Sequence, residues 1–506
     1  SQSEYPADYF RNPLDIPVVL AGTFGELRSN HFHSGLDIKT QGKEGLSIYA
    51  TAEGYISRIK VEHGGYGKAI YINHPNGYTT VYAHLQKFSP RIEKFIKDTQ
   101  YLKENYELDI YTAVDEFPVT KGEIIALSGN TGSSAGPHLH YEIRDNIERP
   151  INPLLFGMQV PDNKPPTVVG VYAYPLGNKS HINQSVDKRV KLRLIPTANG
   201  NFTTEKLQAA GNIGFGVISH DKLDMANNPN GLDNIQSFYN GNKIFEIDFR
   251  KFSFNETGHL NSLIDYAFYT KERERIQRLF VEPNNTLSMY KELNDNGILT
   301  IKDSTSSVYK IKLSDFAGNE SVVTIPINGK EAEVLDTTEP AWNLEVSPDS
   351  PTTIEEGNYR VFIPANSVYT EQLLNFEVVG DTLKLHEDVV PLRKSYTLEY
   401  DISNYQAEDR DKLFLANLYG YYKKPNYIRT RRTENKLVAN PKSFGTYTLA
   451  IDTIPPTIKP VNFQNNKWIS NLNELVVEIE DDLSGIGNYR ATVNGKWILM
   501  EYDYKK

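Results

Sequence analysis

The sequence predicts a mainly β protein of several domains, with a β-rich N-terminal unit that carries one helical insertion and β-sandwich modules after it. The chain has 506 residues, far more than one core normally organises, so three or four domains are expected. Its 32 Tyr against 4 Met favour β structure. Short stretches with a two-residue apolar period, separated by turn clusters, indicate strands.

Three junctions divide the chain, and in each an Asp is followed four residues later by a Pro. They span residues 162–166, 336–340 and 452–456. Because Pro fixes φ and disfavours helix before it, such segments are stiff, extended linkers. The predicted domains are therefore 1–162, 163–335, 336–451 and 452–506.

The units after residue 163 are expected to be β sandwiches. Apolar residues alternate with charged ones in three clear places, at Val190–Leu194, Phe245–Phe249 and Leu475–Ile479. The turns at 315–319 and 482–486 resemble those of bacterial immunoglobulin-like modules. The last unit is short for a sandwich of about 100 residues, which would make it a truncated module.

Two short clusters near the N-terminus combine side chains that bind metals. His33 and Asp37 are four residues apart and share a face in a strand or a helical turn. His138 and His140 lie in a stretch that alternates like a strand, so their imidazoles point to one side. Catalytic zinc takes three imidazole or carboxylate ligands and leaves one position for water. The clusters together predict a zinc site.

A third motif, Tyr82–Leu85, follows an apolar strand (69–72) and a turn at 75–77. With these motifs, residues 17–157 resemble the lysostaphin-type (LytM-like) zinc endopeptidases, which cut peptidoglycan cross-bridges. The residues that carry the resemblance are His33, Asp37, Gly64–Gly67, Tyr82–Leu85, Lys121–Gly122, Ser128–Gly132 and His138–His140.

The resemblance implies that His33, Asp37 and His140 hold one zinc ion per chain. It also implies that His84 and His138 are the catalytic histidines beside the metal. Two imidazoles that are not ligands can accept a proton and stabilise an oxyanion, so no carboxylate base is required.

Alternatives remain open at this site. His31 lies two residues before His33 and is a second candidate ligand. A purely structural zinc is another alternative, although structural sites are usually rich in Cys and this chain has none. Glu142 shares the strand face of the two histidines and is either a supporting residue or a solvated one.

The passage from residue 89 to residue 120 is predicted to be a helical insertion. Ser89 is suited to cap a helix that Pro90 opens, and Ile92, Phe95, Ile96, Thr99 and Leu102 recur at helical spacing. The insertion is either a surface decoration or a wall of the substrate groove.

Composition limits the partners and the location. A net charge of −10 and a sequence pI near 5.7 argue against nucleic acid as a partner. No stretch approaches the ~20 apolar residues of a membrane span. The chain starts at Ser1, which indicates a removed signal peptide or an artificial start. The substrate class then places the protein in a periplasm or the outer envelope.

The sequence therefore predicts a zinc-dependent peptidoglycan endopeptidase that hydrolyses an amide bond in the cross-linking peptide. The acidic chain favours a cross-link with D-amino acids over a glycine bridge. Two alternatives are a non-enzymatic envelope scaffold or activator, whose β modules bind envelope proteins, and a peptidase acting on a protein. A fragment ending near Asp162 is expected to fold and bind zinc alone, because it contains all the motifs.

Overall fold

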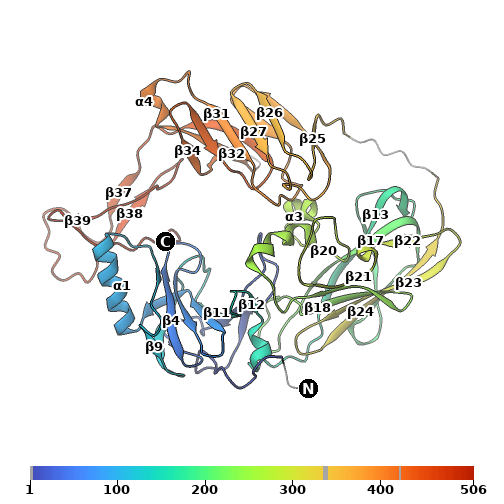
Figure 1. The fold of residues 1–506 in the computed structure, drawn as a ribbon, viewed down its shortest axis with the longest axis horizontal. Helices are drawn as coiled ribbons and strands as arrows, with labels where there is room; N and C mark the ends of the chain where they lie inside the picture. Colours follow the sequence, from blue (N-terminus) through green and yellow to red (C-terminus); the bar gives the residue numbers. More distant parts are fainter. Residues whose placement is uncertain (1–3, 334–339, 421–422) are drawn as a thin grey trace.

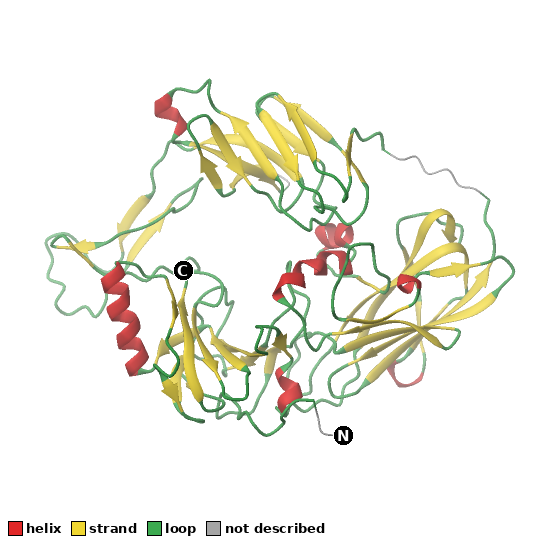
Figure 2. Ribbon diagram, in the orientation of Figure 1, coloured by secondary structure: helices red, strands yellow, loops and turns green. Residues whose placement is uncertain are grey.

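The computed structural model describes residues 4–333, 340–420 and 423–506. Strands dominate these residues and form several separate sheets, as Figure 2 shows. The prediction of a mainly β chain is confirmed. The junctions at 162–166 and 452–456 are segments without helix or strand, whereas the one at 336–340 begins in residues that lie outside the described part.

The N-terminal unit is built on one antiparallel sheet in which β11 lies between β2 and β6. In sheet order its strands are β1 (Leu20–Gly22), β2 (Leu36–Lys39), β11 (His138–Arg144), β6 (Thr79–Ala83), β5 (Lys68–Asn73), β4 (Gly54–Val61) and β8 (Leu108–Tyr111), with β12 (Pro150–Ile151) beside β11 and β9 (Pro118–Val119) beside β4. A smaller sheet consists of β3 (Ser47–Tyr49), β10 (Ile124–Ser128) and β7 (Leu85–Phe88). A 3₁₀ turn, η1 (Pro153–Phe156), follows β12.

The predicted helical insertion is present as α1 (Pro90–Lys103), with Pro90 in its first turn. Ile92 and Ile96 are buried as expected, but Leu102 is 85% exposed. The prediction that Ser89 caps the helix is wrong, since its side chain makes no capping hydrogen bond. After the helix the chain returns to the sheet as β8 and β9, each paired with β4.

The second unit is one large sheet with two short helices, α2 (Leu260–Leu263) and α3 (Tyr266–Glu272). Its strands are β13 (Thr167–Ile182), β14 (Val190–Leu192), β15 (Leu194–Pro196), β16 (Phe202–Thr204), β17 (Leu207–His220), β18 (Asn234–Tyr239), β19 (Asn242–Asp248), β20 (Gln277–Arg278), β21 (Tyr290–Leu293), β22 (Leu299–Ile301), β23 (Ser306–Ser314) and β24 (Glu320–Gly329). The 3₁₀ turns are η2 (Ala198–Gly200), η3 (Phe254–His259) and η4 (Asp295–Gly297).

The first two units have separate sheets but share one apolar core. The ring of the buried Phe252 lies 5.4 Å from that of Phe24 and 5.6 Å from that of Phe32, centroid to centroid. The backbone N–H of Phe32 also donates to Thr257 Oγ1 at 2.8 Å. Residues 1–162 therefore contain all the metal-site motifs, but part of the apolar core that packs against them belongs to the second unit.

The third unit consists of sheets around a core of its own. One sheet contains β26 (Thr352–Glu356), β27 (Tyr359–Ile363), β31 (Thr397–Asp401), β35 (Lys436–Ala439) and β34 (Thr430–Arg432). The other contains β29 (Phe376–Val379), β30 (Thr382–Leu385), β36 (Gly445–Ile451), β32 (Leu413–Tyr419) and β33 (Lys424–Tyr427). A strand pair, β25 (Leu344–Val346) with β28 (Gln372–Leu374), and a helix, α4 (Ala407–Arg410), complete the unit.

The last unit lies beside the first, so that the four units are arranged in a ring (Figure 1). Its strands are β37 (Thr457–Pro460), β38 (Val477–Glu480), β39 (Thr492–Val493) and β40 (Lys496–Trp497), and none of residues 452–506 is fully buried. Arg490 forms an ion pair with Glu104 at 2.8 Å, and the rings of Trp497 and Tyr101 lie 5.1 Å apart. These contacts join the last unit to the end of α1.

Candidate metal centre

The strand register brings the two predicted motifs together. His140 of β11 lies opposite Asp37 of β2 on one side and opposite Ala83 of β6 on the other. Leu139 and Tyr141, which flank His140 on β11 and point to the opposite face, have no exposed surface. One face of β11 is thus held in the core, and the histidines are left on the other face, as the alternation predicts.

Gly35 allows the loop that carries His33 to approach β11. A Cβ at this position would lie 2.3 Å from the carbonyl oxygen of Tyr141 and 2.9 Å from Cγ of Glu142. Such distances exclude any side chain, so the motif requires glycine between His33 and Asp37.

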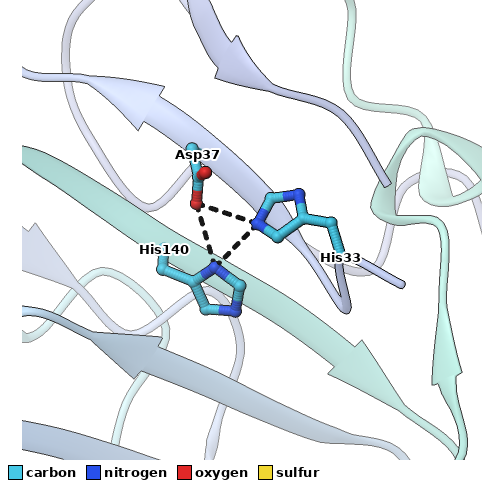
Figure 3. Close-up of side chains that lie close together, drawn as sticks. All are labelled: His33, Asp37 and His140. Atoms are coloured by element: carbon cyan, nitrogen blue, oxygen red, sulfur yellow. Dashed lines mark hydrogen bonds and ion pairs between the residues drawn. The ribbon is translucent and has the colours of Figure 1, made fainter. Parts of the chain in front are cut away.

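His33, Asp37 and His140 form a compact triangle of atoms, shown in Figure 3. His33 Nε2 lies 3.0 Å from Asp37 Oδ1 and 3.1 Å from His140 Nδ1. His140 Nδ1 lies 3.0 Å from the same Asp37 oxygen. All three side chains are buried.

Hydrogen bonds behind the rings fix which nitrogens face the triangle. His33 Nδ1 lies 2.7 Å from the carbonyl oxygen of Thr23, and His140 Nε2 lies 2.8 Å from Glu142 Oε1. Carbonyl and carboxylate oxygens only accept, so these nitrogens carry the protons. In the neutral imidazoles, two nitrogen lone pairs and a carboxylate oxygen therefore converge on one point, and only a cation relieves their repulsion.

The electrostatics of the triangle favour positive charge. Burial would raise the pKa of Asp37, but when His33, His138 and His140 are protonated, their charge and hydrogen bonds hold it well below its ordinary value. Burial would lower the pKa of His140, but hydrogen bonds to Asp37 and Glu142 raise it to about 9. The negative electrostatic potential that favours a proton at the triangle would equally favour a metal ion there.

Glu142, whose role the sequence left open, supports the triangle from behind. Its side chain has no exposed surface. In addition to His140, its carboxylate accepts hydrogen bonds from Ser34 Oγ at 2.6 Å, from Arg144 Nε at 2.6 Å and from the hydroxyl of Tyr66. Although burial opposes ionisation, the charge of Arg144 holds the pKa of Glu142 far below its ordinary value. Glu142 is thus a buried carboxylate that orients His140.

His84 and His138 lie beside the triangle, with ring centroids 4.8 Å apart. His84 Nδ1 donates to the carbonyl of Thr131 at 2.9 Å, and His138 Nδ1 donates to that of Gly136 at 2.8 Å. Both Nε2 atoms are therefore unprotonated in the neutral rings, and that of His138 lies 3.4 Å from Asp37 Oδ1.

His84 is held there by unusual backbone geometry. Its φ of 59° is left-handed and turns the chain between β6 and β7. Burial and the nearby charges of His140 and His138 lower the pKa of His84 to about 3, so the ring is neutral at physiological pH.

The triangle opens into a cleft of about 1070 Å³. All five predicted site residues line it, and so does His31, whose Nδ1 is bonded to the carbonyl of Ser29 at 2.7 Å. His31 is outside the group whose potential ligand atoms lie within 4.8 Å of one another. No residue of α1 lines this cleft, so among the described residues the insertion is not a wall of it.

Sequence reasoning missed part of the cleft wall. Phe254 and Thr257 line it from η3 of the second unit. Arg28 also lines it and donates to the second oxygen of Asp37, Oδ2, at 3.1 Å. No motif marked these residues, whereas Glu142 was marked by its position two residues after His140 on an alternating strand.

Two family models match the chain. Residues 31–105 and 109–153 match peptidase family M23, and residues 345–452 match the Zu5-like domain. The first match contains every predicted site residue. In the part of the chain that the structure describes, no helix has the length and apolar character that crossing a membrane requires.

Curated relatives resemble part of the chain. The DD-carboxypeptidase/endopeptidase Mpg of Neisseria meningitidis serogroup B is 35% identical over 136 residues, which are 27% of this chain and 25% of the relative. The murein hydrolase activator NlpD of Escherichia coli is 32% identical over 151 residues, 30% of this chain and 32% of the relative. The chain thus spans about a quarter to a third of the length of these relatives.

Solved structures also resemble part of the chain. The catalytic domain of the prophage-encoded M23 protein EnpA from Enterococcus faecalis is 22% identical, with 29% of this chain and 98% of that chain covered and a TM-score of 0.22. The catalytic domain of lysostaphin from Staphylococcus simulans is 23% identical, with 28% and 93% covered and a TM-score of 0.20. By its family match, the segment that carries the five predicted site residues is thus similar to peptidase family M23.

Proposed function

We propose that the chain is a zinc-dependent endopeptidase that hydrolyses an amide bond in the cross-linking peptide of peptidoglycan. The observation that carries this proposal is the convergence of His33 Nε2, His140 Nδ1 and Asp37 Oδ1 on one point at the floor of an open cleft. Two imidazole nitrogens and one carboxylate oxygen are a donor set that suits catalytic zinc.

Each ligand of the proposed site is oriented by a partner of its own. Thr23 and Glu142 accept from the outer nitrogens of His33 and His140, and Arg28 holds Oδ2 of Asp37 so that Oδ1 faces the triangle. When bound, zinc supplies a Lewis acid and a water molecule whose pKa is lowered to about 7.

His84 and His138 are the groups that move or hold protons. Each has its Nδ1 hydrogen committed to a backbone carbonyl, which leaves Nε2 free to accept a proton from the attacking water or to face the oxyanion once protonated. Because His84 is neutral and buried, it starts as an acceptor. His138 is less buried, at 15% side-chain exposure, and can exchange a proton with solvent.

The substrate class rests on the relatives as well as on the site. The Neisseria relative is named a DD-carboxypeptidase/endopeptidase, which supports a cross-link between D-amino acids as the scissile bond of this chain. Such a substrate lies outside the cytoplasmic membrane, so we place the protein in the cell envelope.

A second function is favoured by the Escherichia coli relative, which is named a murein hydrolase activator. On that alternative the domain binds and stimulates another hydrolase, and the β modules provide the docking surface. The complete set of five metal-site and catalytic residues favours the enzyme, because an activator needs none of them.

A cleavage assay on purified cross-linked muropeptide dimers separates the two. We expect zinc-loaded wild-type protein to release monomers, and we expect the His138→Ala variant to retain zinc but release at least 100-fold fewer. Failure of the wild type to cut dimers, together with stimulation of a second hydrolase by wild type and variant alike, would establish the activator function instead.

A further inference from the structure

Three carboxylates gather at the junction between the first and second units, away from the metal triangle. Asp162 lies in the linker before β13, Asp221 directly follows β17, and Asp315 directly follows β23. One carboxylate oxygen of each residue lies within 4.8 Å of one oxygen of each of the other two. Asp221 and Asp315 are each only 3% exposed.

Two of the oxygens have no partner although they are buried. Asp221 Oδ1 and Asp162 Oδ2 have essentially no accessible surface and no hydrogen bond. Leaving a buried charged oxygen unpaired is costly, and such groups in proteins are normally satisfied by an ion, a water or a proton. Asp162 and Asp221 also line a small cavity of about 40 Å³, which is enough for a single ion or water.

No basic side chain neutralises the cluster in the described structure. Lys164, in the same linker, donates instead to the carbonyl oxygen of Leu223 at 3.1 Å. Asp315 is held by two hydrogen bonds from Asn319, at 2.8 Å each, which orient its carboxylate but carry no charge. Three carboxyl groups therefore face one another, and the described residues place no basic side chain among them.

We infer that Asp162, Asp221 and Asp315 form a Ca²⁺ site that ties the linker to the second unit. The donors are all hard oxygens, which exclude the nitrogen and sulfur set that zinc prefers. The three carboxylates come from a linker and from the ends of two strands. Such an irregular arrangement suits the flexible coordination of Ca²⁺ better than the near-ideal octahedron that Mg²⁺ requires.

The alternative to a cation is a shared proton, and it has a distinct signature. Burial, followed by the charges of the neighbouring Asp residues, raises the pKa of Asp221 to about 7, and burial raises that of Asp315 to about 6. A protonated cluster would be stabilised by acid and would be indifferent to Ca²⁺.

The carboxylate cluster is linked through one loop to Thr23, the residue that orients His33 in the metal triangle. In the loop that follows Asp221, the N–H of Gly231 donates to Thr23 Oγ1 at 2.9 Å, and Asn228 Nδ2 donates to the carbonyl of Ala21 at 3.1 Å. Thr23 is the residue whose carbonyl orients His33. Ca²⁺ at the cluster would therefore order the loop that follows Asp221. This loop contacts Thr23, which orients His33.

The test uses the full chain, zinc-loaded and free of calcium, at pH 7.5, with Ca²⁺ and Mg²⁺ as probes. Calorimetric titration should show one Ca²⁺ per chain with Kd in the range of about 10⁻⁵–10⁻³ M and weaker Mg²⁺ binding. Ca²⁺ at one hundred times Kd should raise Tm by roughly 5 °C. Asp221→Asn and Asp315→Asn should each weaken Ca²⁺ binding at least tenfold, and Asp187→Asn, at an exposed position of the same unit, should not.

Asp221→Asn has a second expected effect that misfolding cannot imitate. Without Ca²⁺ its Tm should equal or exceed that of the wild type, because the substitution removes one of three repelling charges. Absence of a Ca²⁺ response in the wild type, an unchanged response in both cluster variants, or a lower Tm of calcium-free Asp221→Asn would each overturn the site.

Discussion

Replacing Glu142 by Gln removes one buried charge from the support of the metal triangle and keeps the shape of the side chain. The Glu142 carboxylate accepts the outer proton of His140 at 2.8 Å and is itself fully buried. The amide oxygen of Gln can still accept this hydrogen bond, but without charge, so His140 Nδ1 becomes a weaker donor to a metal.

The expected loss of zinc affinity is about 10–100-fold, the usual effect of removing a group that orients a metal-bound histidine. This corresponds to about 1.4–2.8 kcal/mol of binding free energy. Competition with a chromophoric chelator measures it directly. Circular dichroism of the metal-free protein must accompany the assay, because the substitution also removes a partner of the buried Arg144.

Glu148→Gln is the matched control. Glu148 pairs with the same Arg144 at 2.8 Å, but its side chain is 58% exposed and does not reach His140. Its zinc affinity should stay within about threefold of the wild type. A folded Glu142→Gln protein with wild-type affinity, or an equal loss in both variants, would refute the argument that Glu142 acts through His140.

Three further predictions follow from the site and its surroundings. His84→Ala and His138→Ala should keep one zinc per chain and lower the cleavage rate by about 10²–10⁴-fold, measured by metal analysis and muropeptide release; zinc loss in either would make that residue a ligand. A fragment 1–162 exposes Phe24 and Phe32, which pack on Phe252, so it should have a lower Tm than a fragment 1–335; equal Tm values would show that the shared core adds nothing. Burial lowers the pKa of His74 to about 4, so the unfolded chain binds a proton between pH 6.5 and 4 that the folded chain does not. Stability should be complete above pH 6.5 and fall by up to about 3 kcal/mol as pH drops to 4, and His74→Gln should abolish this component.

The sheet that carries the metal triangle was predictable because its signals are local. The alternation from His138 to Ile143 assigns one face of a strand to the core and the other to the site, and β11 has that arrangement. The motif around His33 and Asp37 lies in a loop and on β2, and its placement beside β11 follows from strand pairing. The helix after Ser89 was likewise visible in its spacing, although its capping was not.

What the sequence did not reveal depends on contacts between distant segments. Phe254 and Thr257 reach the cleft only because the second unit shares its core with the first. The cluster of Asp162, Asp221 and Asp315 joins residues from a linker and two strand ends. The return of Arg490 to Glu104 spans 386 positions. Spacing along the chain contains no information about such pairs, because tertiary packing creates them.

The ligand atoms themselves provide the most direct test of the proposed metal centre. Anomalous diffraction at the zinc edge, on crystals of the zinc-loaded full chain, locates the ion independently of any assumption about activity. We predict one zinc within about 2.0–2.2 Å of His33 Nε2, His140 Nδ1 and Asp37 Oδ1, with at least one position free of protein ligands. A zinc ion bound by His31, His84 or His138, or one enclosed by four protein ligands, would contradict the account.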